Sequence, residues 1–149
     1  MSGTAVKIIP KLSLIRQFSA SPERVYRCWL DAEELKKWFG GTESNKIQFV
    51  NLNPRNGARF RIGLKTTDGT LRLYGGVIKK LSLPNELVFT WARGAGGTQQ
   101  AKTLVSVNFK EKNSGTELIL TQEYFGDETE RLENESIWRH RLDRLSEII

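Results

Sequence analysis

The sequence predicts an α+β domain in which a curved antiparallel sheet of six to seven strands wraps around a long C-terminal helix. Three observations predict this fold. Short runs of alternating apolar residues recur through most of the chain. Turn-forming glycines and asparagines separate these runs. After about residue 127 the apolar spacing changes to that of a helix. The 149 residues suit one domain, so we expect residues 1–149 to form a single unit with a loose lead-in at 1–10.

The chain begins with a predicted strand and two predicted short helices. Apolar and polar residues alternate over 11–18, which indicates the strand. A Ser-Pro pair at 21–22 begins the first helix, because serine caps a helix and proline tolerates its first turn. An acidic capping pattern at 31–34 begins the second helix, and two glycines at 40–41 end it. The predicted buried faces consist of Val25, Cys28, Trp29, Leu35, Trp38 and Phe39.

Residues 45–125 read as consecutive strands joined by short turns, which predicts an antiparallel meander with one buried face. Gly75 and Gly76 lie inside one predicted strand and predict a bulge or a bend that curves the sheet. The predicted turns and loops are at 53–57, 68–69, 84–85, 94–97 and 113–115.

The C-terminal segment predicts a helix of about 20 residues, roughly 30 Å long and able to cross a whole sheet. Its apolar face is Trp138, Leu142, Leu145 and Ile149, spaced by four, three and four residues, and Leu132 would extend it. A straight helix and a curved sheet touch along a line, so we expect an apolar cavity between them.

Several motifs, in this order, resemble one known family. They are residues 15–26, Trp38-Phe39, residues 56–60, residues 74–78 followed by 84–91, residues 115–118, and Trp138 with Leu142 and Leu145. From about residue 12 to 148 the chain resembles the activator of Hsp 90 ATPase homologue family, in the START-like (SRPBCC, birch-pollen-allergen-like) superfamily. The resemblance implies the helix-grip fold. Two positions depart from the family pattern: Ile137 stands where relatives have glycine, and Gln122 where they often have histidine. No role of that histidine is therefore carried over.

Charge and cysteine content narrow the functional classes. The net charge is +6, and residues 126–149 carry seven acids and four arginines, so the rest of the chain carries +9. The basic residues are spaced singly, as at Arg59, Arg61 and Lys65, which indicates a solvated sheet face and no nucleic-acid partner. No stretch reaches the ~18 apolar residues of a membrane span. The lack of a secretory signal and the lone Cys28 predict a cytoplasmic protein.

The titratable residues suggest no catalytic or metal-binding set. His140 is the one histidine, stands between two arginines and is expected to be solvent-exposed, while Cys28 is expected in the core. We nominate no catalytic residue, metal or cofactor, and enzymatic activity is left open but not expected. The inward-facing aromatic residues could fill the core or line a pocket, and we expect some of them to do each. The ligand-binding set drawn from the inward-facing positions is Trp29, Trp38, Phe39, Phe60, Leu73, Phe89, Trp91, Val107, Leu120, Gln122, Trp138 and Leu142.

These observations favour the non-enzymatic binding of a hydrophobic small molecule, a lipid or an aromatic polyketide-like compound, between the sheet and the C-terminal helix. Gln122, Tyr124 or Arg16 would orient it; the alternative for Arg16 is an edge position that reaches water. The resemblance leaves two alternatives open. One is a stress-response module that docks on a chaperone or another protein, and the other is a polyketide cyclase-like enzyme that uses Gln122 or Tyr124. We expect a monomer or a weak homodimer.

Overall fold

The computed structural model describes residues 9–40, 46–94 and 102–149. Within these ranges the expected elements are present in the expected order. They are β1 (Leu12–Phe18), α1 (Pro22–Leu30), α2 (Ala32–Trp38), β2 (Lys46–Asn51), β3 (Arg59–Lys65), β4 (Leu71–Ser82), β5 (Glu86–Arg93), β6 (Thr103–Lys112), β7 (Gly115–Glu123) and α3 (Glu128–Ile148). The lead-in at 1–8, Gly41 and the loop positions 95–97 lie outside the described residues.

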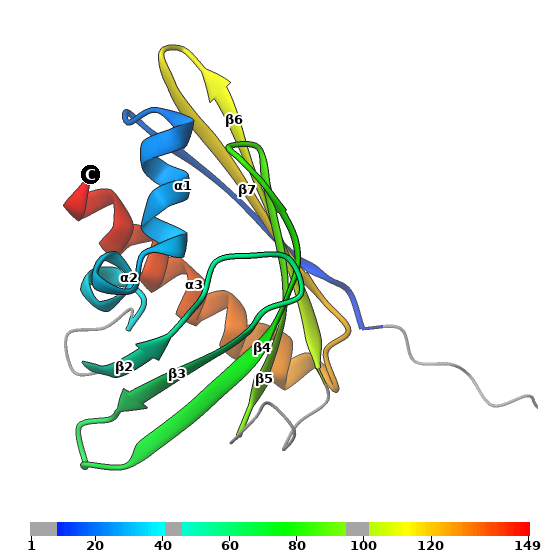
Figure 1. Cartoon of the computed structure of the whole chain (residues 1–149). Helices are drawn as coiled ribbons and strands as arrows, with labels where there is room; N and C mark the ends of the chain where they lie inside the picture. The colour runs from blue at the N-terminus through cyan, green and yellow to red at the C-terminus, as the bar shows by residue number, and fades with distance from the viewer. Residues whose placement is uncertain (1–8, 41–45, 95–101) are drawn as a thin grey trace, which may run out of the picture.

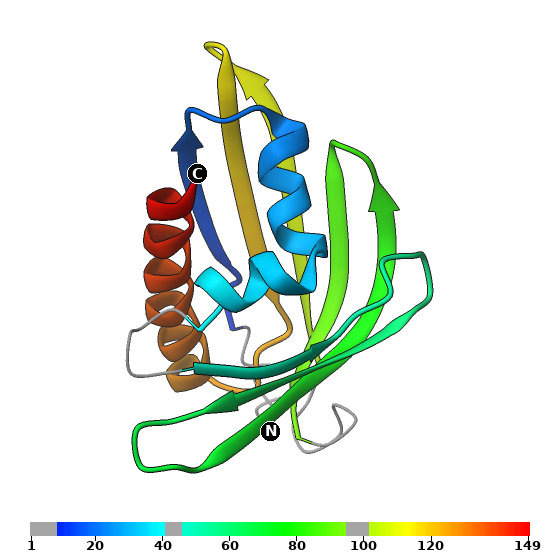
Figure 2. The same cartoon turned by 60° about the vertical axis from the view of Figure 1, so that its left-hand side comes forward.

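The seven strands form one antiparallel sheet in the order β1-β7-β6-β5-β4-β3-β2. Strands β2 to β7 follow one another as a meander, and β1 joins its far edge beside β7. The sheet curves, α1 and α2 lie over its inner face, and α3 runs beside them (Figures 1 and 2). This arrangement confirms the predicted fold class.

Asp31 joins the two short helices. It ends α1, and its Oδ1 accepts hydrogen bonds from the backbone N–H of Glu33 and Glu34, at 2.8 and 3.2 Å, where α2 begins. Both N–H groups would otherwise lack a partner in the first turn. The sharp corner brings the rings of Trp29 and Trp38 to 4.8 Å, so one capping residue sets the angle between two aromatic anchors.

The register shift in β4 is not at Gly75 and Gly76, where a bulge or a bend was expected, but a few residues later. Strand β4 changes register against β5 between Ile78 and Lys80. Gly76 has a different role, because a Cβ at this position would lie 1.8 Å from the carbonyl oxygen of Thr90. Only glycine permits the two backbones to approach so closely.

Helix α3 buries most of the face that its spacing predicts: Trp138, Leu142 and Leu145 are completely enclosed, and Ile149 is half-buried at the C-cap. Leu132 is 51% exposed, so it does not extend this face, and a charged residue, Arg141, joins it instead. None of the helices in the described part of the chain is long and apolar enough to cross a membrane.

Candidate functional site

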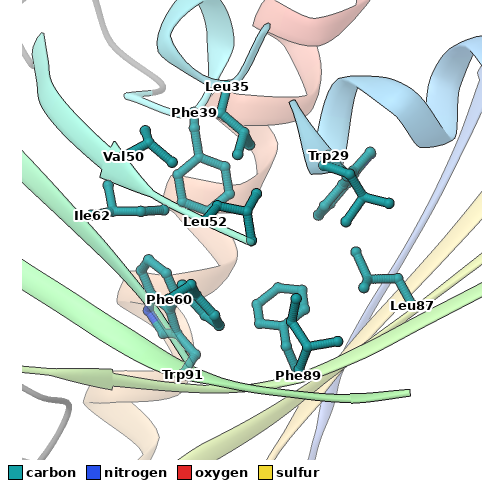
Figure 3. A pocket seen from close by; sticks show the side chains of 12 residues that line it. Trp29, Leu35, Phe39, Val50, Leu52, Phe60, Ile62, Leu87, Phe89 and Trp91 are labelled. Atoms are coloured by element: carbon teal, nitrogen blue, oxygen red, sulfur yellow. The ribbon is translucent and has the colours of Figure 1, made fainter. Parts of the chain in front are cut away.

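An apolar cavity of about 40 Å³ lies between the two short helices and strands β2 to β5 (Figure 3). Its walls are apolar side chains that project from both layers. Among the described residues, those that line it are Trp29, Leu30, Leu35, Phe39, Val50, Leu52, Phe60, Ile62, Ile78, Leu87, Phe89 and Trp91. Helix α3 supplies none of these, so the apolar hollow is beneath α1 and α2 and not, as the sequence predicted, beneath α3.

Aromatic rings form much of the wall, and all of them belong to the predicted set: Trp29, Phe39, Phe60, Phe89 and Trp91. The Phe60 ring meets Phe89 edge to face at 5.6 Å, and Phe39 meets Trp91 at 5.5 Å. Such edge contacts fix the rings relative to one another. The aliphatic part of the wall was missed, although its strand members Ile62, Ile78 and Leu87 have the inward parity of the aromatic residues.

Trp29, one of the residues that line this cavity, carries a polar group that is unpaired within the described residues. Its indole Nε1 is buried and has no hydrogen-bond partner in the described part of the chain. Among the described residues it is the one buried side-chain polar atom without a partner. The other deeply buried indoles are satisfied: Trp38 donates to the carbonyl oxygen of Cys28 at 3.0 Å, and Trp138 to Gln122 at 2.8 Å. An unpaired buried N–H is unfavourable, and a ligand oxygen could satisfy it.

The space directly beneath the apolar face of α3 is filled. Trp138 stacks on Trp29 with ring centroids 5.7 Å apart, and Leu142 is fully buried. Three more residues of the predicted set, Trp38, Val107 and Leu120, are also fully enclosed and line neither cavity described here. These five residues form core instead of cavity wall, because the side chains of the helices and the sheet pack tightly against one another there.

Leu73 lies on the other face of β4. Tyr74 pairs with the buried Ile62 of β3 and therefore faces inward, and its ring stacks on Trp91 at 5.0 Å. Successive strand residues point to opposite faces. Leu73 is consequently outward and half-buried, and Tyr74 takes the inward position.

A second cavity, of about 100 Å³, lies between α3 and the strands β4 to β7. Its walls are mostly polar, and Trp91 lines both this cavity and the apolar one. The lining residues are Arg72, Tyr74, Trp91, Ala92, Arg93, Thr103, Gln122, Glu130, Glu133, Asn134, Ile137 and Arg141. The hollow predicted beneath α3 thus exists, but with polar chemistry.

Arg141 is the most unusual residue in this second cavity, because it is only 4% exposed. Its guanidinium carbon lies 4.1 Å from the ring centre of Phe39 and 4.7 Å from that of Trp138. Its Nε donates to the carbonyl oxygen of Phe39 at 2.9 Å. Burial lowers the pKa of Arg141 to about 10, and nearby Tyr74 acts in the opposite direction. The group therefore remains charged at neutral pH.

The polar atoms of the Gln122 side chain are hydrogen-bonded to other side chains of the protein. Its Nε2 donates to Thr103 Oγ1 at 2.9 Å and to Asn134 Oδ1 at 3.4 Å, and its Oε1 accepts from Trp138 at 2.8 Å. Both amide hydrogens are therefore in use. The side chain lines the polar cavity but holds α3 against β6 and β7.

The other two polar candidates also lie apart from the apolar cavity. Arg16 Nη1 pairs with Asp143 Oδ1 at 2.6 Å, so this arginine connects β1 to α3. Tyr124 is 66% exposed. His140 is exposed and Cys28 is buried, as expected. Burial raises the pKa of the Cys28 thiol despite the opposing charge of Arg24.

Arg141 was not predicted as a site residue, because in the sequence it stood only as one of the two arginines that flank the exposed His140. The signal was nevertheless present, since Arg141 lies three residues after Trp138 and four before Leu145 and so shares their helical face.

Comparison with known proteins gives a consistent assignment. The model of the family described as Activator of Hsp90 ATPase homolog 1-like protein matches residues 19–149. Comparison with curated proteins finds no match. Among solved structures, a protein from Chromobacterium violaceum superposes with a TM-score of 0.84 at 22% identity, covering 93% of this chain and 96% of that one.

Two further solved structures agree. The AHSA1 protein from Silicibacter pomeroyi has a TM-score of 0.81 at 21% identity, covering 93% of this chain and 96% of that one. The AHSA1-like protein from Aeromonas hydrophila has a TM-score of 0.77 at 19% identity, covering 93% and 90%. At these identities the likeness establishes the fold.

Proposed function

This chain belongs to the family of Activator of Hsp90 ATPase homolog 1-like proteins, and from that premise we propose that it binds a hydrophobic small molecule without converting it. The ligand occupies the apolar cavity beneath α1 and α2. The observation that carries the proposal is the aromatic and aliphatic wall of this cavity, which includes Trp29, whose indole N–H has no hydrogen-bond partner among the described residues. A mostly apolar hollow with few polar groups is typical of small-molecule sites.

Binding requires the cavity to widen. Its volume is about 40 Å³, whereas a cavity of about 150 Å³ accommodates benzene. Val50 and Leu52 are only half-buried, and β2 is an edge strand that pairs with β3 alone. Displacing β2 outward breaks fewer hydrogen bonds than displacing any interior strand, so the ligand enters on this side.

The expected affinity is modest for a small probe. Burial of roughly 200 Å² of apolar surface contributes about 5 kcal/mol at about 25 cal/mol per Å². Moving β2 opposes part of this gain. A two-ring probe should therefore bind with a Kd on the order of 0.1–1 mM.

Calorimetric titration with 1-naphthol tests the proposal, because this probe combines an apolar body with a hydroxyl oxygen that can accept from Trp29. The variant Leu52→Phe fills the cavity from its half-buried wall and should abolish the binding heat. Leu71→Phe makes the same chemical change at an exposed position and should preserve it. Absent heat in the native protein, or equal heat in both variants, contradicts the proposal.

A second function, docking on an acidic protein surface, is favoured by one observation. Arg59, Arg61 and Lys65 lie exposed on the outward face of β3, and in the described ranges they form no ion pair. Such a stripe accelerates association at low salt. If the partner is Hsp90, as the family description suggests, the protein should change Hsp90 ATPase activity at low salt. The double variant Arg59→Glu and Arg61→Glu should not. Equal effects of the native and variant proteins on Hsp90 ATPase activity contradict this docking function.

We also propose a cytoplasmic location. A single buried cysteine, Cys28, supports it, because reducing compartments are where unpaired thiols are common. Fractionation of cells that express the native chain tests this, and recovery outside the cytoplasm contradicts it.

A further inference from the structure

The guanidinium of Arg141 is held in place on three sides. The rings of Phe39 and Trp138 lie 4.1 and 4.7 Å from its central carbon, and the ring of Trp91 lies 5.4 Å away. Its Nε donates a hydrogen bond to the carbonyl oxygen of Phe39. The two Nη groups donate to no protein atom in the described part of the chain, and Arg141 lines the polar cavity. The free edge of the cation is thus the edge that pairs with a carboxylate in bidentate geometry.

Within residues 9–40, 46–94 and 102–149 this cation has no counter-ion. No carboxylate of the described residues lies within ion-pair distance of Arg141, although two glutamates line the same cavity. Glu130 Oε2 instead accepts from the backbone N–H of Gly126 at 3.0 Å, and Glu133 is exposed to solvent. Arginine is rarely buried this deeply without a paired anion. The fold therefore keeps a charged donor beside a hollow that can admit its partner.

We propose that the polar cavity between α3 and the sheet binds a small organic carboxylate through the Nη edge of Arg141. The charge of the lining supports a monoanion. Arg72, Arg93 and Arg141 face Glu130 and Glu133 around the cavity, which leaves a net charge of +1. A monoanion neutralises this net charge, whereas a dianion such as phosphate would leave the occupied cavity with a net charge of −1.

The rest of the lining suits a carboxylate with a short carbon stem. The cavity of about 100 Å³ has room for such a group. Tyr74 supplies a phenol, and Trp91 and Ile137 supply apolar surface for the stem. Burial lowers the pKa of Arg141 only to about 10, so the cation is available at neutral pH.

Two sources of carboxylate fit this chemistry, a free small acid and the head group of a hydrophobic acid. Because Trp91 lines both cavities, an acid with a long tail could place its head at Arg141 and its chain in the apolar cavity. The carboxylate site itself does not depend on the apolar cavity being a binding site.

Nuclear magnetic resonance of the ¹⁵N-labelled full chain tests the inference. The Nε–H signal of Arg141, identified by its loss in Arg141→Met, is followed during titration with sodium acetate, with acetamide and sodium chloride as neutral and ionic controls. We expect a saturable shift with acetate alone. Tyr74→Phe should weaken acetate binding roughly 3–10-fold if its phenol donates to the ligand. Arg59→Met, on the outer face of β3, should bind acetate like the native chain.

Sodium decanoate then distinguishes the source of the carboxylate. A decanoate shift at both Arg141 and Trp29 indicates the head group of a hydrophobic acid, and a shift at Arg141 alone indicates a free small acid. An acetate response no larger than that of acetamide or chloride overturns the inference, as does saturable acetate binding, read at the Trp91 indole, in Arg141→Met. If Arg141→Met does not fold, the acetate and acetamide titrations of the native chain decide. Failure of 1-naphthol to bind would contradict only the apolar site.

Discussion

The indole N–H of Trp138 in α3 donates to Oε1 of Gln122 in β7 at 2.8 Å, and both side chains are completely buried. The amide of Gln122 also donates to Thr103 in β6 and to Asn134 one turn earlier in α3. A single glutamine therefore connects the C-terminal helix to two strands. When one side chain of a buried hydrogen-bond network is removed, its partners are left without hydrogen bonds.

Replacing Gln122 by leucine should destabilise the fold. The change leaves the Trp138 N–H without an acceptor and removes the amide partner of Thr103 and Asn134, at a cost of about 2–4 kcal/mol. Urea unfolding measures the loss. Gln17→Leu is the matched control, because Gln17 bonds Glu117 at the exposed edge and should change stability by less than about 0.5 kcal/mol. Equal losses in the two variants would show that the buried network is unimportant.

Replacing Arg141 by methionine should raise the thermal unfolding midpoint. The folded-state pKa of Arg141, about 10, is below its ordinary value of 12.5. Between these values the unfolded chain binds more protons, so this residue's contribution to stability rises with pH, and the buried charge is unfavourable at pH 7. A gain of about 1 kcal/mol corresponds to roughly 2–4 °C.

Arg131→Met is the control on the same helix. Arg131 pairs with Glu128 and Glu135, and its removal should lower the midpoint or leave it unchanged. A larger loss of stability in Arg141→Met than in Arg131→Met would mean that the packing of Arg141 stabilises the fold by more than its buried charge destabilises it.

Replacing Glu133 by glutamine should tighten acetate binding by about two- to fivefold, because it removes a negative charge from the wall of the cavity. The effect should shrink at high salt. Glu147→Gln, at the far end of α3, removes the same charge and should leave the acetate affinity unchanged. Weaker binding in Glu133→Gln would mean that Glu133 takes part in holding the ligand.

The β3–β4 turn should contribute acid-sensitive stability. Hydrogen bonds from Thr66 and then Thr70 lower the pKa of Asp68 to about 2. A lowered folded-state pKa stabilises the fold above the unfolded value near 4, and this contribution disappears as the pH falls through about 2. The stability difference between native protein and Asp68→Asn should therefore be full at pH 6 and vanish near pH 2. A difference that is constant with pH would contradict this.

The fold could be predicted from the sequence because its signals are local. The alternation in β1 and the spacing from Trp138 to Leu145 each specify an element without knowledge of its neighbours. The position of the cavity depends on how closely two layers approach, and no pattern in α3 shows that Trp138 would stack on Trp29 and fill the space.

The candidate site was predicted in part for the same reason. Aromatic residues on inward strand faces were identified correctly, but Leu73 was assigned to the wrong face because the hairpin pairs Ile62 with Tyr74. Arg141 was missed because a buried arginine looks, in sequence, like any residue of a charged helix. Its burial follows from the tertiary contact with Phe39.

The four indole N–H signals of the native protein provide the most direct test of ligand binding in the apolar cavity. Trp29 and Trp91 line it, whereas Trp38 and Trp138 are hydrogen-bonded away from it. Titration with 1-naphthol should shift the Trp29 and Trp91 signals saturably, with Trp29 moving most as its N–H gains an acceptor. The Trp38 and Trp138 signals should stay nearly fixed. If all four signals remain unchanged, or if Trp29 is unaffected while others move, the apolar cavity is not a binding site.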